Sequence, residues 1–324
     1  GILIKGSNYL ETLSHVDQVV FDKTGTLTQG QFTLMHIDSF NLESSYILEL
    51  AAYAEAHLNH PIAQSILKSY AKSINHKRIQ AIKDFPGKGV EAIIDQNLIH
   101  IGNSKLFIQN NITIVKEIHQ SSELMLALNG IHVANIYLSD TIKNDSYNAI
   151  QKLKDMSISN IYLLSGDKKD IAERIGHQLG INHVIAQCLP HEKVEAIKKL
   201  LKNQTGKSKT AFVGDGINDA PSLAISDIGI AMGALGSDAA IEAADVVILN
   251  DEPSKVADAI KHAKLVMRIV KQNIIFALGI KIGTLILASF GLASMWLAIF
   301  ADVGVALLAV LNASRILQNK QKRV

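Results

Sequence analysis

The chain has 324 residues, of which 48% are hydrophobic and 19% are charged, so it is long enough and apolar enough for about two domains with packed cores. Its formal charge of +2, from 32 basic and 30 acidic side chains, leaves no excess of cations that would favour nucleic acid as a main partner. Cys188 is the only cysteine, which excludes an internal disulfide framework and a cysteine-cluster metal site.

Residues 13 to 250 alternate short β-branched runs with helical patterns, which predicts an α/β domain with a largely parallel sheet. The predicted buried strands are Val16 to Phe21, Ile161 to Leu164, Lys209 to Val213 and Ile228 to Ala231. Between about residues 30 and 130 the pattern changes to a helical stretch, Ser44 to Tyr70, followed by short strands and glycine turns. We therefore expect an inserted second domain.

The first predicted strand leads directly into the run Asp22-Lys23-Thr24-Gly25-Thr26-Leu27-Thr28. This run holds a carboxylate at a strand end, among exposed backbone amides and hydroxyls that suit a phosphate. An aspartate there can attack a phosphoryl group in line if Mg²⁺ and a lysine neutralise the charge of the transferring oxygens. The run therefore predicts a nucleophile in a phosphate-binding turn.

Three further motifs supply the remaining groups for such chemistry. Ser165 follows the second strand, Lys193 offers an ammonium group, and the run from Gly214 to Asp219 offers hard oxygen ligands of the kind Mg²⁺ requires. Ligands of open α/β sheets sit at the carboxyl ends of strands, where these motifs are predicted to lie. Each motif alone is compatible with a turn, a helix cap or a solvated lysine, but the four in this order favour phosphoryl transfer.

With these motifs the chain resembles the P-type ATPases, which are built on the haloacid-dehalogenase-like fold and carry DKTGTLT around the phosphorylated aspartate. The resemblance implies that Asp22 is phosphorylated and that it binds Mg²⁺ with Asp215 and the main-chain carbonyl of Thr24. Ser165 and Lys193 would hold the phosphate. By the same resemblance, residues 1–32 form a stalk and the first part of a Rossmannoid phosphorylation domain, 33–130 an α+β nucleotide-binding domain, and 131–252 the rest of the phosphorylation domain. Residues 253–324 form a second stalk, a transmembrane hairpin and a cytoplasmic tail.

The resemblance also gives Asn218 and Asp219 a supporting role at the phosphate and Mg²⁺ site. Soluble phosphatases of this fold usually carry a second acidic residue two positions after the nucleophile, where this chain has Thr24. Without that general acid an acyl phosphate should persist, as a pump requires and a phosphatase does not.

In the expected insertion, Glu55 and His60 lie in EAHLNHPIA, which resembles the His-Pro motif of heavy-metal-transporting P-type ATPases. The resemblance places His60 against the adenine of ATP. It also assigns four more positions to nucleotide contact: Gly87, Gly89, Gly102 and Asn103. The glycines would let the backbone approach the ligand closely.

Residues 274 to 311 are almost continuously apolar, long enough for two membrane helices of about 20 residues each. We expect these at Asn273 to Ala293 and at Trp296 to Ile316. The basic residues that flank the pair predict a hairpin with both ends in the cytoplasm: Lys264, Arg268, Lys271, Arg315, Lys320, Lys322 and Arg323.

Lys281 and Asp302 are charged residues inside these apolar segments, where charge is costly, so both are candidates for function. Their pattern resembles the zinc, cadmium and lead subgroup of heavy-metal pumps, and a carboxylate suits a borderline divalent ion. The resemblance implies that Asp302 is a ligand or countercharge of the transported ion. Lys281 would be a built-in cation that stabilises the empty site.

These expectations describe ATP-driven export of Zn²⁺, Cd²⁺ or Pb²⁺ through an integral membrane protein, in a bacterial plasma membrane with its catalytic domains in the cytoplasm. We expect the chain to begin within a longer protein, whose upstream actuator domain and membrane helices would be its partners. Two alternatives stay open: a membrane-tethered phosphohydrolase, and a nucleotide-binding fragment without activity.

Overall fold

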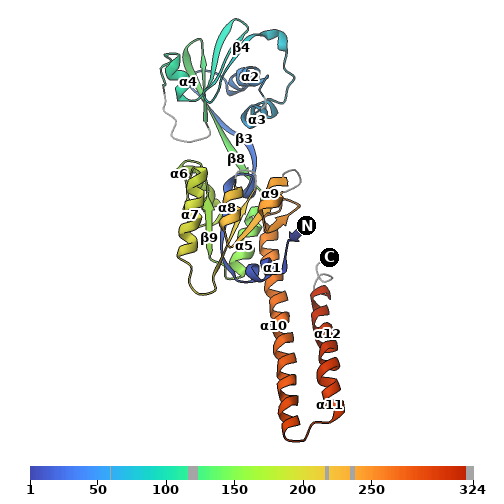
Figure 1. Cartoon of the computed structure of the whole chain (residues 1–324). Coiled ribbons are helices and arrows are strands. Elements are labelled where there is room, and N and C mark those ends of the chain that lie inside the picture. The colour runs from blue at the N-terminus through green and yellow to red at the C-terminus, as the bar shows by residue number, and fades with distance from the viewer. Residues whose placement is uncertain (59, 116–122, 216–218, 234–237, 319–324) are drawn as a thin grey trace.

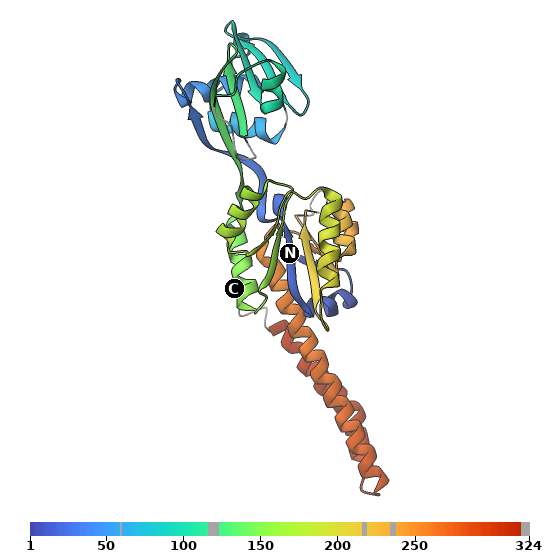
Figure 2. The ribbon, with the colours of Figure 1, turned by 90° about the vertical axis from the view of Figure 1, so that its left-hand side faces the viewer.

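The computed structural model describes residues 1–58, 60–115, 123–215, 219–233 and 238–318. Its parts are arranged in a row, with an antiparallel-sheet domain at one end, a parallel-sheet domain in the middle and a helical hairpin at the other end (Figures 1 and 2).

The parallel-sheet domain contains a seven-stranded sheet in the order β1-β13-β12-β11-β2-β9-β10. Only the edge pair of β1 with β13 is antiparallel. The strands are β1 (Ile2–Ile4), β2 (Val16–Asp22), β9 (Asn160–Leu164), β10 (His183–Ile185), β11 (Lys209–Gly214), β12 (Ile228–Met232) and β13 (Val246–Ile248). The four strands expected from the sequence are confirmed, and they pair in parallel as predicted.

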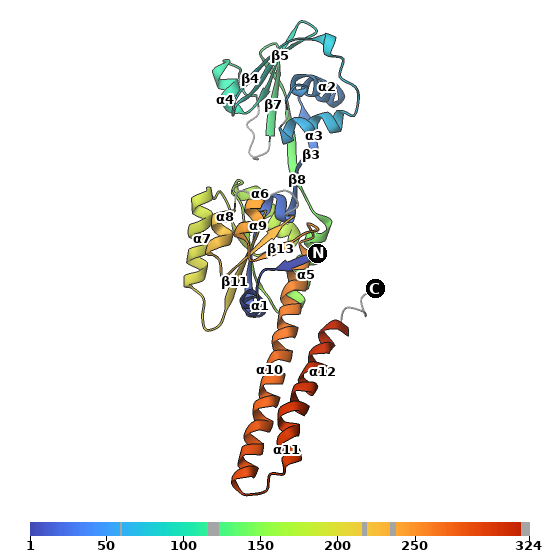
Figure 3. The ribbon, with the colours of Figure 1, turned by 45° about the vertical axis from the view of Figure 1, so that its right-hand side comes forward.

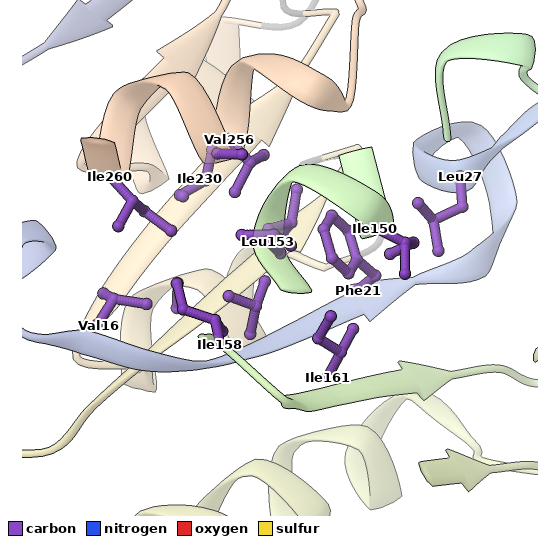
Figure 4. Close-up of a cluster of buried hydrophobic side chains, with 14 of the residues drawn as sticks. Val16, Phe21, Leu27, Ile150, Leu153, Ile158, Ile161, Ile230, Val256 and Ile260 are labelled. Carbon is purple, nitrogen blue, oxygen red and sulfur yellow. The ribbon is translucent and has the colours of Figure 1, made fainter. Parts of the chain in front are cut away.

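Helices cover both faces of this sheet, because successive side chains of a strand point to opposite faces. Val19 and Phe21 of β2 pack in one cluster, whereas Val20 packs in another. On the first face lie α1 (Ser7–Ser14), α5 (Asn144–Asp155), α6 (Lys169–Leu179) and the start of α10, and Figure 4 shows part of this core. On the second face lie α7 (Pro190–Lys202) and α8 (Ala220–Ile225), with α9 (Asp238–Ala243) beside α8.

The antiparallel-sheet domain has six strands in the order β3-β8-β7-β6-β5-β4. Apolar side chains of α2 and α3 pack with those of the sheet in one core. Its elements are β3 (Thr28–Ser39), α2 (Ser44–Glu55), α3 (Pro61–Tyr70), η2 (His76–Arg78), β4 (Ile79–Phe85), β5 (Gly89–Ile94), β6 (Asn97–Gly102), α4 (Ser104–Gln109), β7 (Glu123–Leu128) and β8 (Ile131–Ile142).

Two features of this domain differ from the expectation. The sheet reaches beyond 33–130, because β3 and β8 stay paired from Ser39 opposite Ala134 to Thr28 opposite Ile142 and so form the connection to the parallel-sheet domain. The expected single helical stretch is two helices. Pro61 occupies the first turn of α3, and the His60 Nδ1 accepts the Ala63 N–H at 3.2 Å, which starts a new helix there.

The helical hairpin begins inside the parallel-sheet core. Helix α10 (Ser254–Ser289) buries Val256 and Ile260 against that core and then continues without interruption into the hairpin (Figures 3 and 4). The returning segment consists of α11 (Met295–Ile299), a π-helical turn η3 (Phe300–Gly304) and α12 (Val305–Gln318).

Among the described residues, two helical segments are long and apolar enough to cross a membrane, Ser254–Ser289 and Met295–Ile316. The expected first span, Asn273 to Ala293, is too long at its end. The helix stops at Ser289, and Gly291 adopts a φ of +71° in the turn that follows.

The packing of α10 leads to a test of how firmly the hairpin is anchored. Ile260 is fully buried, so Ile260→Ala should lower the free energy of unfolding by about 2–5 kcal/mol. Ile275 lies on the same helix but is 72% exposed, so Ile275→Ala should change it by less than about 1 kcal/mol. Urea unfolding of the detergent-solubilised chain, followed by circular dichroism, measures both. Equal losses would contradict the anchoring role of Ile260.

Candidate active site

The polar motifs meet at the carboxyl ends of three adjacent strands, β9, β2 and β11. Asp22 ends β2, Ser165 follows β9 and Asp215 follows β11. A cavity of about 280 Å³ opens there, lined by Asp22, Thr24, Gly166, Asp167, Cys188, Pro190, Lys193, Asp215 and Asp219.

Lys193, from α7, connects two buried carboxylates of this cavity. Its Nζ lies 2.5 Å from the Asp22 Oδ1 and 3.0 Å from the Asp219 Oδ1. The side chains of Asp22 and Asp219 are only 5% and 2% exposed, and the Lys193 ammonium forms an ion pair with each of them. The Thr24 N–H donates to the Asp22 Oδ2 at 3.1 Å, which fixes the other carboxylate oxygen.

This crowding changes the acid–base behaviour of the cluster. Burial raises the pKa of Asp22 to about 7, the charge of Asp219 adds to the rise, and Lys193 opposes it. Burial likewise raises the pKa of Asp219. Burial alone would lower the pKa of Lys193, but the charges of Asp22 and Asp219 outweigh it and raise that pKa. The site therefore has more negative charge than one ammonium neutralises.

The donor set fits Mg²⁺, which prefers carboxylate and carbonyl oxygens. Gly25 turns the chain with a φ of +75°, and a Cβ placed on it would lie 3.5 Å from the Asp215 Oδ2, so Asp215 packs directly over this turn. Within the described ranges no three His, Cys, Asp or Glu side chains already converge as a metal site. Asp22, Asp215 and the carbonyl of Thr24 are the groups that would hold Mg²⁺.

Ser165 is 1% exposed, and its Oγ accepts the Asp167 N–H at 3.1 Å. The hydroxyl thus orders the loop Gly166–Asp167 at the edge of the cavity, as a serine that caps a turn does. Asn218, which the sequence predicts as a supporting residue, lies outside the described residues.

In the antiparallel-sheet domain, Glu55 and His60 lie side by side, with the His60 Nε2 3.2 Å from the Glu55 Oε2. The two atoms are not aligned for a hydrogen bond, so the Glu55 Oε2 is buried without a hydrogen-bond partner. Burial raises the pKa of Glu55 to about 7, and the charge of Asp84 adds to the rise. A buried acceptor without a donor is unstable by itself, and a ligand donor such as an exocyclic amino group would satisfy it.

The four remaining positions of the expected nucleotide site fall into two groups. Gly89 and Gly102 are paired across β5 and β6, and a Cβ on either would lie 2.2 Å from a backbone oxygen of the chain itself. Close strand packing therefore explains these two glycines. Gly87, with a φ of +72°, has open space where a Cβ would be, and the Asn103 Nδ2 donates to its carbonyl at 2.9 Å. Gly87, in the turn between β4 and β5, and Asn103, directly after β6, thus lie next to each other at the end of the sheet.

The charged residues of the hairpin face each other. The Lys281 Nζ of α10 lies 3.8 Å from the Asp302 Oδ1 of the π-helical turn η3. A cavity of about 320 Å³ between the helices is lined by this pair and by Thr284, Leu285, Ala298 and Ala301. π-helical turns are frequent at functional sites because they displace a side chain from regular helical spacing.

Comparisons with known proteins agree with this geometry. The family model of the haloacid dehalogenase-like hydrolases matches residues 16–227. The chain is 46% identical over 99% of its length to the cadmium, zinc and cobalt-transporting ATPase of Bacillus subtilis, and 47% identical over 98% to the zinc-transporting ATPase of Synechocystis. A crystal structure of a zinc-transporting PIB-type ATPase in the E2·Pi state superposes with a TM-score of 0.81 at 32% identity over 98% of this chain.

The chain belongs to the haloacid dehalogenase-like hydrolases, in their P-type ATPase branch. It spans 46% and 44% of the lengths of the two relatives and 52% of the solved structure, which is about half of each.

One part of this P-type ATPase site was not predicted from the sequence. Lys23, directly after Asp22, is 5% exposed, and its Nζ lies 2.6 Å from the Asp167 Oδ2 and 3.6 Å from the Asp140 Oδ2. The Thr28 Oγ1 donates to Asp140 at 2.5 Å, and burial raises the pKa of that carboxyl group. Asp140 belongs to β8, so these contacts connect the turn after Asp22 (residues 23–27) to the connecting strands β3 and β8. The available signal was that Lys23 and Asp167 each follow a predicted strand, whereas no sequence pattern indicated Asp140.

A second unpredicted contact acts on the same turn. The Lys143 Nζ donates to the Gly25 carbonyl at 2.8 Å and pairs with the Asp251 Oδ1 at 2.7 Å. Lys143 therefore connects the turn after Asp22 to the segment just before α10.

The raised pKa of Glu55 predicts a pH-dependent stability. The pKa of Glu55 is about 7 in the folded state, against an ordinary value of 4.5, so the folded state keeps the proton that the unfolded state loses. The stability that comes from the protonated carboxyl group is therefore present at low pH and is lost as the pH rises through 7. Glu55→Gln should therefore stabilise the antiparallel-sheet domain by up to about 3 kcal/mol at about pH 8, and by almost nothing at about pH 4.5.

Thermal unfolding of the parent and of Glu55→Gln between these pH values measures this difference. Glu43→Gln, at an exposed position just before α2, is the matched control and should show no such trend. A Glu55→Gln effect that stays constant with pH would show that this carboxyl group is not held protonated by burial.

Proposed function

We propose that this chain is the catalytic and last membrane portion of a pump that uses ATP to export a divalent heavy-metal ion, with Asp22 phosphorylated in each cycle. The observation that carries the proposal is the arrangement of two charged sites on one framework. The Asp22–Lys193 cluster lies in the parallel-sheet domain, and α10 runs from the core of that domain to Lys281 and its partner Asp302.

Asp22 is the nucleophile in this proposal. One of its carboxylate oxygens attacks the γ-phosphorus of ATP, a new O–P bond forms, and the bond to the β-phosphate oxygen breaks to release ADP. Lys193 holds the approaching oxygens by charge, and the Thr24 N–H keeps the second carboxylate oxygen in place. Mg²⁺, when bound at Asp22, Asp215 and the Thr24 carbonyl with support from Asn218 and Asp219, supplies charge neutralisation for the transferring phosphoryl group.

ATP would bind to the antiparallel-sheet domain. His60 and the Glu55 carboxyl group, whose buried Oε2 has no hydrogen-bond partner, would recognise adenine. Gly87 and Asn103 would contact the rest of the nucleotide. Gly89 and Gly102 would support this site by close strand packing. The paired strands β3 and β8 connect this domain to Asp22, so they are the route along which bound nucleotide is delivered.

Asp302 would bind or balance the transported ion, and Lys281 would replace the ion's charge when the site is empty. Zn²⁺ and Cd²⁺ appear in the names of the two relatives, whereas Pb²⁺ rests on the sequence resemblance alone. The pump would lie in a bacterial plasma membrane, with both sheet domains in the cytoplasm. Its actuator domain and remaining membrane helices would belong to a longer protein of the length of these relatives.

A membrane-tethered phosphohydrolase is the alternative function. Thr24 weighs against it, because its hydroxyl is a poor proton donor where soluble phosphatases of this fold have a carboxylic acid. The aspartyl phosphate would then survive long enough to be coupled to transport.

Asp302→Ala tests the transport proposal in the full-length protein that contains this chain. Zn²⁺- or Cd²⁺-stimulated ATP hydrolysis should fall to the unstimulated rate, because Asp302 is the only carboxylate among residues 273–289 and 295–316 of the hairpin. Ser289→Ala, which removes a hydroxyl at the end of α10, is the control and should keep full stimulation. Full metal stimulation in Asp302→Ala would count decisively against the ion site.

A further inference from the structure

Two histidines of the antiparallel-sheet domain lie together without any role in the site described above. His57 follows the end of α2 and His76 begins η2, nineteen positions later along the chain. Their ring centres are 5.2 Å apart, the ring planes are tilted by 48°, and both residues are exposed. Their nitrogens are therefore accessible to an ion from solvent.

The backbone around both histidines is held by one tyrosine. Tyr53 lies one helical turn before His57 on α2, and its hydroxyl oxygen accepts the Asn75 N–H at 3.3 Å and an Arg78 N–H at 3.2 Å. Asn75 and Arg78 flank His76 on both sides. The guanidinium of Arg78 also stacks over the Tyr53 ring at 4.5 Å and pairs with Glu49 at 2.7 Å. These contacts hold the backbone on both sides of His76 against α2, next to His57.

The spacing of the rings matches that of two histidines on one tetrahedral ion. With a metal–nitrogen distance of about 2.0 Å, about 1.1 Å from nitrogen to ring centre and an angle of about 109°, the ring centres lie roughly 5 Å apart. Imidazole suits Zn²⁺, Ni²⁺ and Cu²⁺ among divalent ions, whereas Mg²⁺ prefers oxygen. The separation of the two ring centres therefore fits two imidazoles that bind one ion.

We propose that His57 and His76 bind one borderline divalent transition-metal ion, such as Zn²⁺, with water in its remaining positions. No third His, Cys, Asp or Glu completes a cluster within the described ranges, so the site would bind ions more weakly than a closed structural zinc site. The bound ion would link the segment before α3, which carries His60, to η2. This site is separate from Asp302 and does not depend on the proposed transport.

Isothermal titration of the whole chain with Zn²⁺ tests the site, without a polyhistidine tag and with excess Mg²⁺ to occupy the hard oxygen ligands. His57→Gln and His76→Gln should each weaken one Zn²⁺-binding event by about tenfold or more, because each removes one of only two protein ligands. The double variant should abolish this binding event, because it removes both imidazoles, whereas each single variant keeps one. His177→Gln, at an exposed histidine of α6, should leave the titration unchanged.

Both substitutions are at exposed positions, and unchanged circular dichroism without metal would show that the variants fold. Zn²⁺ binding that is the same in the parent, His57→Gln and His76→Gln would overturn the proposal. Two separate Zn²⁺-binding events, of which each single variant loses one and leaves the other unchanged, would also overturn it, because they would mean that the two histidines bind separate ions.

Discussion

The structure depends on the ion pair between Asp22 and Lys193. Parallel strands bring their carboxyl ends to one edge of the sheet, and with them the carboxylates of Asp22, Asp215 and Asp219. Such a cluster of buried like charges is unstable unless a cation lies within it. Lys193 supplies that cation, and its position on α7 matters as much as its charge. Burial and the charge of Asp219 raise the pKa of Asp22, and in the proposed function Mg²⁺ would neutralise this negative charge.

Two structural connections join this site to the rest of the molecule. The turn after Asp22 is connected to the paired strands β3 and β8 by contacts among Lys23, Thr28 and Asp140. These strands lead to the antiparallel-sheet domain. On the other side, α10 begins among the buried side chains of the parallel-sheet core and continues to Lys281 (Figure 3). A change of charge at Asp22 therefore has a continuous structural route toward the nucleotide and toward the membrane pair.

Local sequence patterns predicted much of this arrangement. Apolar runs that end in polar motifs gave the strands of the parallel sheet, and an apolar stretch with two charges gave the hairpin and its Lys281–Asp302 pair. Contacts between distant segments left no such pattern. Asp140 is recognised as a partner of Lys23 only when β8 is seen to pair with β3, and Gly89 and Gly102 are needed by the strands themselves because of a register that only the fold defines. The end of the first span was misplaced because glycine and small residues before Met295 turn the chain without lowering its hydropathy.

The most direct test of the account is whether Asp22 accepts phosphate. The chain is incubated with Mg²⁺ and ATP labelled on the γ-phosphate, quenched in acid and then treated with hydroxylamine, which cleaves acyl phosphates. We expect acid-stable label that hydroxylamine removes, lost in Asp22→Asn and kept in Asp17→Asn, an exposed aspartate on the same strand β2. Label that persists in Asp22→Asn, or a parent chain that takes up none, would contradict the assignment of Asp22 as the nucleophile.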